Sequence, residues 1–250
     1  MAGRYAPHLE GIARRREWML EQTLSWSQIN SGSRNTAGVT AMAAALEAAA
    51  EPLGVTVERL QPKPLEEVDL TGRQSELPLG PVLRLSRSRP GARVRVLLAG
   101  HLDTVFPADH PFQTPRWLDD NTVNGPGVTD LKGGLAVMLT ALEALEASPW
   151  GQGVDWQILL NPDEEIGSPG SAPFLAEAAR ERDIGLVFEP ALADGTLAGG
   201  RKGSGNWTAV VRGRAAHAGR EHHLGRNAVV ALAGFVTALD GLNGQRQGVT

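Results

Sequence analysis

Three acidic residues, Asp163, Glu164 and Glu165, stand together shortly after the apolar run Ile158-Leu159-Leu160. Carboxylates this close to one another raise each other's pKa, so they stay ionised only beside a cation, beside an arginine or in open water. The triplet alone therefore leaves two interpretations. It is either a solvated acidic turn or part of a cation site.

Other groups that bind metals are expected at the same place. His101 follows an apolar stretch at residues 94–99, Glu189 follows another at residues 184–188, and Asp130 begins a helix after a glycine-rich loop. The carboxyl ends of parallel strands share one edge of a sheet, so these side chains should converge there with Glu164 and Glu165. The chain has no cysteine, and one imidazole with several carboxylates suits zinc or a similar divalent ion.

The residues also suggest separate roles within such a site. Asp103 is placed to accept a hydrogen bond from the second ring nitrogen of His101, although a turn aspartate is the alternative. Asp130 could bridge two metals about 3.5–4 Å apart, and its alternative is a helix cap. Of Glu164 and Glu165, one could bind a metal while the other takes a proton from water held at the metal.

The elements that must position these residues form an α/β pattern. Apolar periodicity predicts helices at residues 8–29, 36–50, 131–145 and 171–182, the second of them capped by Asn35 or Thr36. It predicts strands at 55–60, 82–86, 93–99, 155–160 and 184–188, with loops at 61–78 and 107–123. Pro90 and Gly91 suggest that the strands at 82–86 and 93–99 form a hairpin. The predicted fold class is a largely parallel sheet flanked by helices.

The pattern changes near residue 200. A strand at 207–212 and a helix at 227–242 predict the start of a smaller α+β domain, so we divide the chain into residues 1–199 and 200–250. The net charge of −4 among 250 residues gives no basic footprint for nucleic acid or for an anionic membrane. Residues 1–20 lack the apolar core of a signal peptide and no run could span a bilayer, so the expected location is cytoplasmic.

Several motifs together resemble the M20 family of metallopeptidases, and most of all its glutamate carboxypeptidase branch. They cover nearly the whole chain in the family's order: His101-Leu102-Asp103-Thr104, Gly127-Val128-Thr129-Asp130 with Lys132-Gly133-Gly134, Asp163-Glu164-Glu165, Glu189-Pro190 and Arg214-Ala215-Ala216-His217-Ala218-Gly219. The resemblance implies the zinc exopeptidase fold with a dimerisation or lid domain. It also implies two zinc ions per subunit.

The resemblance assigns the roles that the residues alone leave open. His101 and Glu189 would hold one zinc, Asp130 would bridge, and Glu165 would hold the other. Glu164 matches the family's catalytic base, and Asp103 matches the acid that orients the first histidine. His217, on its own an exposed loop histidine, matches the histidine that in dimeric members reaches the partner subunit's active site and stabilises the developing oxyanion.

Members of this family are usually longer, and their returning segment supplies one more histidine ligand and the grip on the substrate carboxylate. We therefore expect a C-terminally truncated chain with an incomplete site. The expected reaction is hydrolysis of an amide in a small peptide or N-acyl amino acid, with release of a C-terminal glutamate as the leading case. The alternatives are an N-acyl amino acid deacylase or desuccinylase and a non-catalytic metal-binding or dimerisation fragment. A homodimer is the expected partner.

Overall fold

The computed structural model describes residues 2–192, 194–200 and 202–247. The chain forms two compact units, one comprising Met1–Glu67 with Gln74–Ser204 and the other Val68–Arg73 with Gly205–Thr250. The catalytic and dimerisation roles expected for residues 1–199 and 200–250 stay predictions.

A five-stranded mixed sheet forms the centre of the first unit, in the order β1 (Thr56–Leu60), β4 (Val82–Arg87), β8 (Val154–Asn161), β5 (Val94–His101), β9 (Ile184–Val187). β8, β5 and β9 run parallel, and β4 is antiparallel to both of its neighbours. Four of the five strands therefore share one direction, which confirms the predicted largely parallel sheet. The predicted hairpin is wrong, because β8 lies between β4 and β5 and pairs with both.

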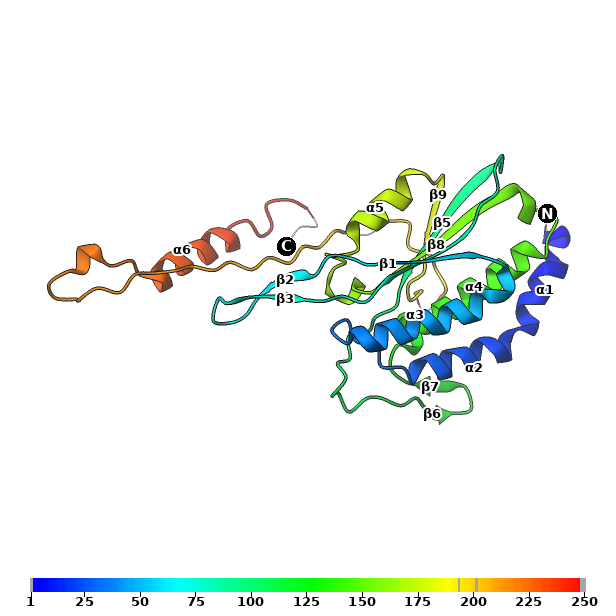
Figure 1. The fold of residues 1–250 in the computed structure, drawn as a ribbon, viewed down its shortest axis with the longest axis horizontal. Helices are drawn as coiled ribbons and strands as arrows, with labels where there is room; N and C mark the ends of the chain where they lie inside the picture. The colour runs from blue at the N-terminus through cyan, green and yellow to red at the C-terminus, as the bar shows by residue number, and fades with distance from the viewer. Residues whose placement is uncertain (1, 193, 201, 248–250) are drawn as a thin grey trace. The chain divides into compact units, whose positions relative to one another are not determined.

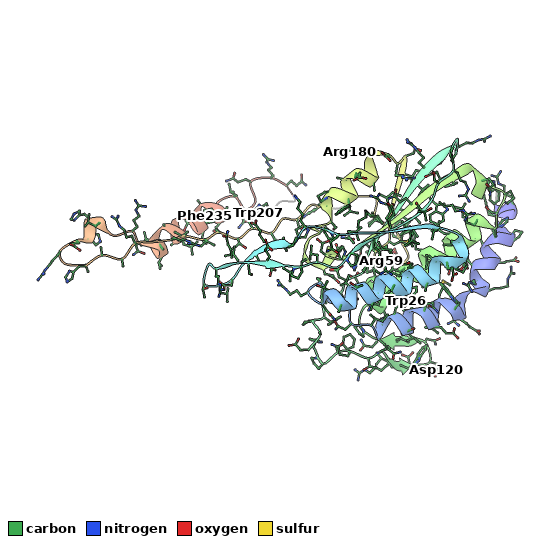
Figure 2. All side chains as sticks on the ribbon, in the orientation of Figure 1. Trp26, Arg59, Asp120, Arg180, Trp207 and Phe235 are labelled. Atoms are coloured by element: carbon green, nitrogen blue, oxygen red, sulfur yellow. The ribbon has the colours of Figure 1, made fainter. Side chains whose placement is uncertain are left out.

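Helices cover both faces of this sheet. α2 (Arg16–Ser27), α3 (Thr36–Ala50) and α4 (Gly133–Glu146) pack on one face, and α5 (Ala172–Arg180) lies on the other (Figure 1). Alternate strand residues point to opposite faces, so Leu98 and Ile158 contribute to the larger core while Leu97 and Leu159 meet α5. Trp26, 2% exposed, belongs to the larger core (Figure 2).

Three segments differ from the elements predicted for the first unit. The helix predicted at 8–29 is divided at Arg15 into α1 (Ala6–Arg14) and α2. The predicted loops contain two small sheets, β2 (Leu65–Val68) with β3 (Gln74–Leu77) and β6 (Arg116–Asp119) with β7 (Thr122–Asn124). Short helical turns complete the unit: η1 (Ala2–Arg4), η2 (Glu51–Leu53), the π-type η3 (Val128–Lys132), η4 (Gly151–Gly153) and η5 (Glu164–Ile166).

The second unit contains η6 (His222–Leu224) and α6 (Ala228–Asp240). Residues 207–212, predicted as a strand, do not belong to a strand in the described part of this unit. α6 is apolar but exposed, as at Val229 and Phe235. Among the described helices of both units, none has the length and apolar character needed to cross a membrane.

Gly38 tests how closely the start of α3 packs against the backbone of Asn30. The Gly38 N–H donates to the Asn35 side chain at 3.1 Å, which confirms Asn35 as the helix cap, and a Cβ on Gly38 would lie 1.7 Å from the Asn30 carbonyl oxygen. Alanine normally stabilises a helix interior by about 0.5–1 kcal/mol relative to glycine. Gly38→Ala should instead lower the free energy of unfolding by about 1 kcal/mol or more, because the carbonyl must move.

Chemical denaturation measures the effect, with Gly11→Ala in α1 as the matched control. A Cβ at Gly11 meets only the end of the Arg14 side chain at 3.9 Å. The control should be neutral or stabilising. Equal gains in both variants would contradict the close approach at Gly38.

Candidate metal and active site

His101 is the last residue of β5 and is buried, at 1% exposure. Its position at the end of the strand follows from the parallel pairing with β8, in which His101 is opposite Asn161. Gly100, just before it, leaves room for Leu131, since a Cβ there would lie 2.8 Å from Leu131 Cδ2. This close packing brings η3 and its aspartate to the end of the strand.

Asp130 meets His101 directly. His101 Nε2 lies 2.9 Å from Asp130 Oδ1. The backbone of Asp130 departs from helical geometry inside η3, and the peptide bond between Asp130 and Leu131 is cis. The turn begins after Gly127, whose φ of +69° favours glycine.

Lys132 fixes this turn to the end of α2, a role that the sequence analysis did not assign. Its buried ammonium donates to the carbonyl oxygens of Trp26 at 2.9 Å and Ile29 at 2.7 Å. Those carbonyls lie at the C-terminal end of α2, where a cation is favourable. Burial lowers the pKa of Lys132 to about 8.

Asp103 holds the turn that carries the two glutamates. Its carboxylate accepts hydrogen bonds from the Glu164 N–H at 3.1 Å and the Glu165 N–H at 3.1 Å. It also accepts the Ser33 hydroxyl proton at 2.6 Å. Ser33 was not singled out by the sequence analysis, and its only signal was the polar stretch of residues 30–33.

The ring of His101 is oriented mainly by the backbone of Asp103. His101 Nδ1 lies 3.0 Å from the Asp103 carbonyl oxygen and 3.4 Å from the carboxylate Oδ1. A proton on Nδ1 would be donated to that carbonyl and would leave the Nε2 lone pair facing Asp130. The geometry thus suits Nε2 as a metal ligand.

The predicted metal-binding side chains come together in two overlapping groups. One group is His101, Asp130 and Glu165, and the other is His101, Glu164 and Glu189; in each, the ligand atoms lie within 4.8 Å of one another. Glu189 Oε2 is 3.9 Å from His101 Nε2. We call these five residues the acidic cluster. Which glutamate holds a metal and which acts as a base stays a prediction.

Asp163, the first acid of the triplet, has a different place. Its buried carboxylate accepts hydrogen bonds from the Gly170 N–H at 2.7 Å, the Ser171 N–H at 3.2 Å and the Ser171 hydroxyl. These bonds close the turn between η5 and α5. Asp163 therefore has a structural role, and the two glutamates that follow it belong to the cluster.

The cluster carries an excess of negative charge that shifts its pKa values. Burial lowers the pKa of His101, but Asp103, Glu189 and Asp130 outweigh that effect and raise it to about 9. Burial, and then the neighbouring Asp130, raise the pKa of Glu165 to about 7. Negatively charged neighbours contribute to both shifts, and a divalent cation would reduce that contribution.

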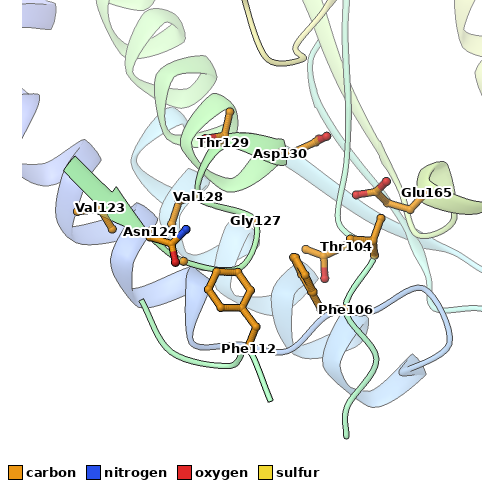
Figure 3. Close-up of a pocket in the computed structure, with 12 residues that line it drawn as sticks. Thr104, Phe106, Phe112, Val123, Asn124, Gly127, Val128, Thr129, Asp130 and Glu165 are labelled. Carbon is orange, nitrogen blue, oxygen red and sulfur yellow. The ribbon is translucent and has the colours of Figure 1, made fainter. Parts of the chain in front are cut away.

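A pocket of about 320 Å³ opens beside the cluster. Figure 3 shows Asp130 and Glu165 on one side of it and Phe106 and Phe112 on the other. His217, by contrast, belongs to the second unit, where its Nδ1 accepts the Gly219 N–H at 3.2 Å. Its role in catalysis stays a prediction.

Comparisons with known proteins show the family to which the chain belongs. Residues 97–238 match the model of Peptidase family M20/M25/M40. Carboxypeptidase G2 of Pseudomonas sp. (strain RS-16) is 32% identical over 210 residues, which cover 83% of this chain and 47% of that protein. Succinyl-diaminopimelate desuccinylase of Novosphingobium aromaticivorans is 28% identical over 208 residues, 79% of this chain and 51% of that protein.

Human carnosine dipeptidase 1 has the same fold, with a TM-score of 0.61 and 20% identity over 74% of this chain and 41% of that chain. The chain therefore belongs to peptidase family M20/M25/M40, a family of metal-dependent enzymes, as its motifs predicted. The carboxypeptidase relative supports the predicted resemblance to the glutamate carboxypeptidase branch. The chain spans about half the length of these curated relatives, 47% and 51%.

The raised pKa of Glu165 predicts a pH-dependent stability of the metal-free protein. In the folded protein the pKa of Glu165 is about 7, above the ordinary value of 4.5. The protonated side chain therefore contributes its full stabilisation when the pH is below 4.5. That stabilisation is lost as the pH rises through about 7. Glu165→Gln keeps an uncharged side chain, so its thermal midpoint should exceed that of the unmodified chain at about pH 8 and approach it at about pH 5.

Thermal unfolding in the presence of a chelator measures both midpoints. The exposed Glu10, replaced by Gln, is the control and should show no such pH-dependent difference. If the difference in thermal midpoint between Glu165→Gln and the unmodified chain stayed constant across this pH range, it would contradict the raised pKa of Glu165.

Proposed function

We propose that the protein is a zinc-dependent hydrolase of an amide bond in a small peptide or N-acyl amino acid. The observation that carries this proposal is the acidic cluster, in which a buried imidazole lies 2.9 Å from Asp130 and the ligand atoms of each group lie within 4.8 Å. Nitrogen and oxygen ligands without thiols fit zinc, and the local excess of negative charge fits a divalent cation.

His101, Asp130, Glu165 and Glu189 are the residues that would hold metal, with Asp130 in the bridging position between two ions. When bound, the metal supplies Lewis-acid activation of the amide carbonyl and of the attacking water. Asp103 keeps His101 and the glutamate turn in place. This division of labour among the side chains is the one that the family resemblance predicts.

Glu164 is the proposed general base. It would take a proton from the attacking water and deliver it to the leaving amine as the amide bond breaks. Its backbone N–H is fixed by Asp103 at 3.1 Å, which limits the positions that its carboxylate can reach. His217 is proposed to stabilise the oxyanion in a partner subunit, the role that the family resemblance predicts.

The names of the relatives favour two substrate classes. One relative is a carboxypeptidase, and several others are desuccinylases. The first candidate reaction that we propose is release of a C-terminal glutamate or a similar amino acid. The second candidate is removal of an N-acyl group. A homodimer and a cytoplasmic location stay predictions.

Replacement of Glu164 tests the catalytic proposal. Glu164→Gln should lower kcat about 100-fold or more, because general-base catalysis contributes about 10²–10⁴-fold. It should leave the zinc content unchanged, since the base is not one of the proposed ligands. Elemental analysis and hydrolysis of glutamate-terminated peptides, N-acetyl amino acids and N-succinyl amino acids provide the measurements.

The matched control is Glu177→Gln on α5, whose exposed carboxylate lies 3.4 Å from Arg84. It should retain full activity. Bound zinc without hydrolysis by the unmodified chain would favour the non-catalytic module. A preference for the acyl compounds would favour the deacylase or desuccinylase alternative.

The proposed homodimer predicts a mass in solution of twice the chain's 26.5 kDa. Light scattering measures this mass directly. If His217 acts across the dimer, mixing Glu164→Gln with His217→Ala should restore part of the activity that each variant lacks, since one mixed site keeps both residues. A monomeric but active protein would contradict this role.

A further inference from the structure

A second cavity, of about 360 Å³, lies in the first unit between α1 and the C-terminal half of α4. The two helices are in contact and lie side by side (Figure 1). Since α4 rises about 1.5 Å per residue, Thr140 and Ala147 lie about 10 and 20 Å along it from Gly133, where the helix begins. Among the described residues, the cavity shares no lining residue with the pocket beside the acidic cluster. It is therefore separate from the proposed active site.

Small residues keep this cavity open. Gly11 of α1 lines it, together with Ala144 and Ala147 at the end of α4. A Cβ on Gly11 would meet only the end of the Arg14 side chain, at 3.9 Å. No residue of α1, which is described throughout, is buried, so this helix packs on α4 without filling the space between them. A volume of about 300–1,000 Å³ is typical of sites for small molecules, and this cavity lies within that range.

The lining carries more positive than negative charge, although the chain as a whole has a net charge of −4. Its acid, Glu143, is already paired, because Arg15 Nη2 lies 2.8 Å from Glu143 Oε1. The Arg15 guanidinium also lies over the ring of Trp18, at 4.3 Å from the centroid, which fixes it further. The guanidinium of Arg14, in contrast, has no ion pair or hydrogen bond with any residue that the structure describes. One cation at the cavity is therefore available to a ligand.

Two further polar side chains line the cavity. The imidazole of His8 is held edge to face against Trp150, with ring centroids 5.3 Å apart. Thr140 is 1% exposed, and its hydroxyl has no hydrogen-bond partner among the described residues. A helical threonine populates two χ1 rotamers, so this hydroxyl can turn toward a bound group. A buried hydroxyl without a partner destabilises the free protein, and a ligand would supply the partner.

We propose that the cavity between α1 and α4 binds a small monocarboxylate with an apolar body. Arg14 presents parallel N–H donors that match a carboxylate, and His8 provides a further donor beside it. The apolar body lies against the glycine and alanine surface of the two helices. A cationic ligand is disfavoured, because the carboxylate of Glu143 is already neutralised by Arg15. This site is independent of the proposed hydrolysis.

Two ligands of equal shape test the selection by charge, 3-phenylpropionate and 3-phenylpropionamide. Calorimetry with the full chain should show one site for the acid with a Kd of about 1 mM or tighter. The amide should bind about fivefold more weakly, because it cannot form an ion pair with the exposed Arg14. The backbone amide signals of Gly11 and Ala144 should shift in NMR spectra as the acid binds. These results should be the same with zinc and with a chelator, since the cavity requires no metal.

Replacement of Arg14 tests the origin of the selectivity. Arg14→Gln should lower the affinity for 3-phenylpropionate about fivefold and leave that for the amide unchanged. The matched control is Arg16→Gln, since Arg16 is also exposed but does not belong to the described lining. Arg16→Gln should leave both affinities unchanged. Equal losses in the two variants would show a general effect of net charge and would overturn the role of Arg14.

Filling the cavity tests its location. Gly11→Leu should abolish binding of both compounds, because the new side chain occupies the space beside Arg14. Leucine favours a helix more than glycine does, so α1 should stay folded, which the thermal midpoint checks. The matched control is Gly234→Leu in α6, another helical glycine, where an added Cβ meets nothing within 4 Å. This control should bind both compounds as the unmodified chain does.

The outcomes separate this inference from the proposed function, because none of these measurements uses hydrolysis. Selective binding by an inactive chain would support the cavity site and contradict the hydrolase. Hydrolysis by a chain that binds neither compound would support the hydrolase and overturn the cavity site. Equal affinities for the acid and the amide, binding that persists in Gly11→Leu, or binding that requires zinc would each overturn the inference.

Discussion

The buried carboxylate of Asp103 is the group on which the geometry of the site depends. It accepts one hydroxyl donor from Ser33 and the backbone N–H groups of Glu164 and Glu165, so its charge is satisfied by three donors. Its own carbonyl oxygen orients His101. Three segments far apart in the sequence thus meet at one residue, and the imidazole and the glutamate turn keep a fixed separation because both contact it.

The convergence of the site could be predicted because it follows from strand direction. His101 and Glu189 lie at or just beyond the ends of parallel strands, so their meeting required no knowledge of side-chain contacts. The order of strands could not be predicted in the same way. Pro90 and Gly91 form a turn as expected, but the two strands that they connect pair with β8 and not with each other. A local turn signal does not reveal which strand lies between its neighbours.

The supporting contacts could not be predicted because they connect distant residues of ordinary types. Ser33 is 70 positions from Asp103, and Lys132 is 103 positions from Ile29. Serine in a polar stretch or lysine at the start of a helix has many surface roles. The roles of the three acids at residues 163–165 could not be separated from the sequence either. Asp163 closes a turn while Glu164 faces the cluster, and only the packed structure separates two adjacent carboxylates of similar chemistry.

The pairing of acids elsewhere in the first unit indicates what the cluster is for. Glu146 pairs with Arg89, and this arginine lowers the pKa of the acid against the effect of burial. Asp155 accepts the Arg89 backbone N–H and pairs with Arg182, and these contacts lower its pKa in the same way. Asp130 and Glu189 instead share the imidazole of His101, whose pKa is raised to about 9 by its acidic surroundings. A solvated turn would show no such shift, since water would stabilise each carboxylate separately. Acids gathered around one imidazole therefore favour a cation site over the solvated turn that the triplet alone would also allow.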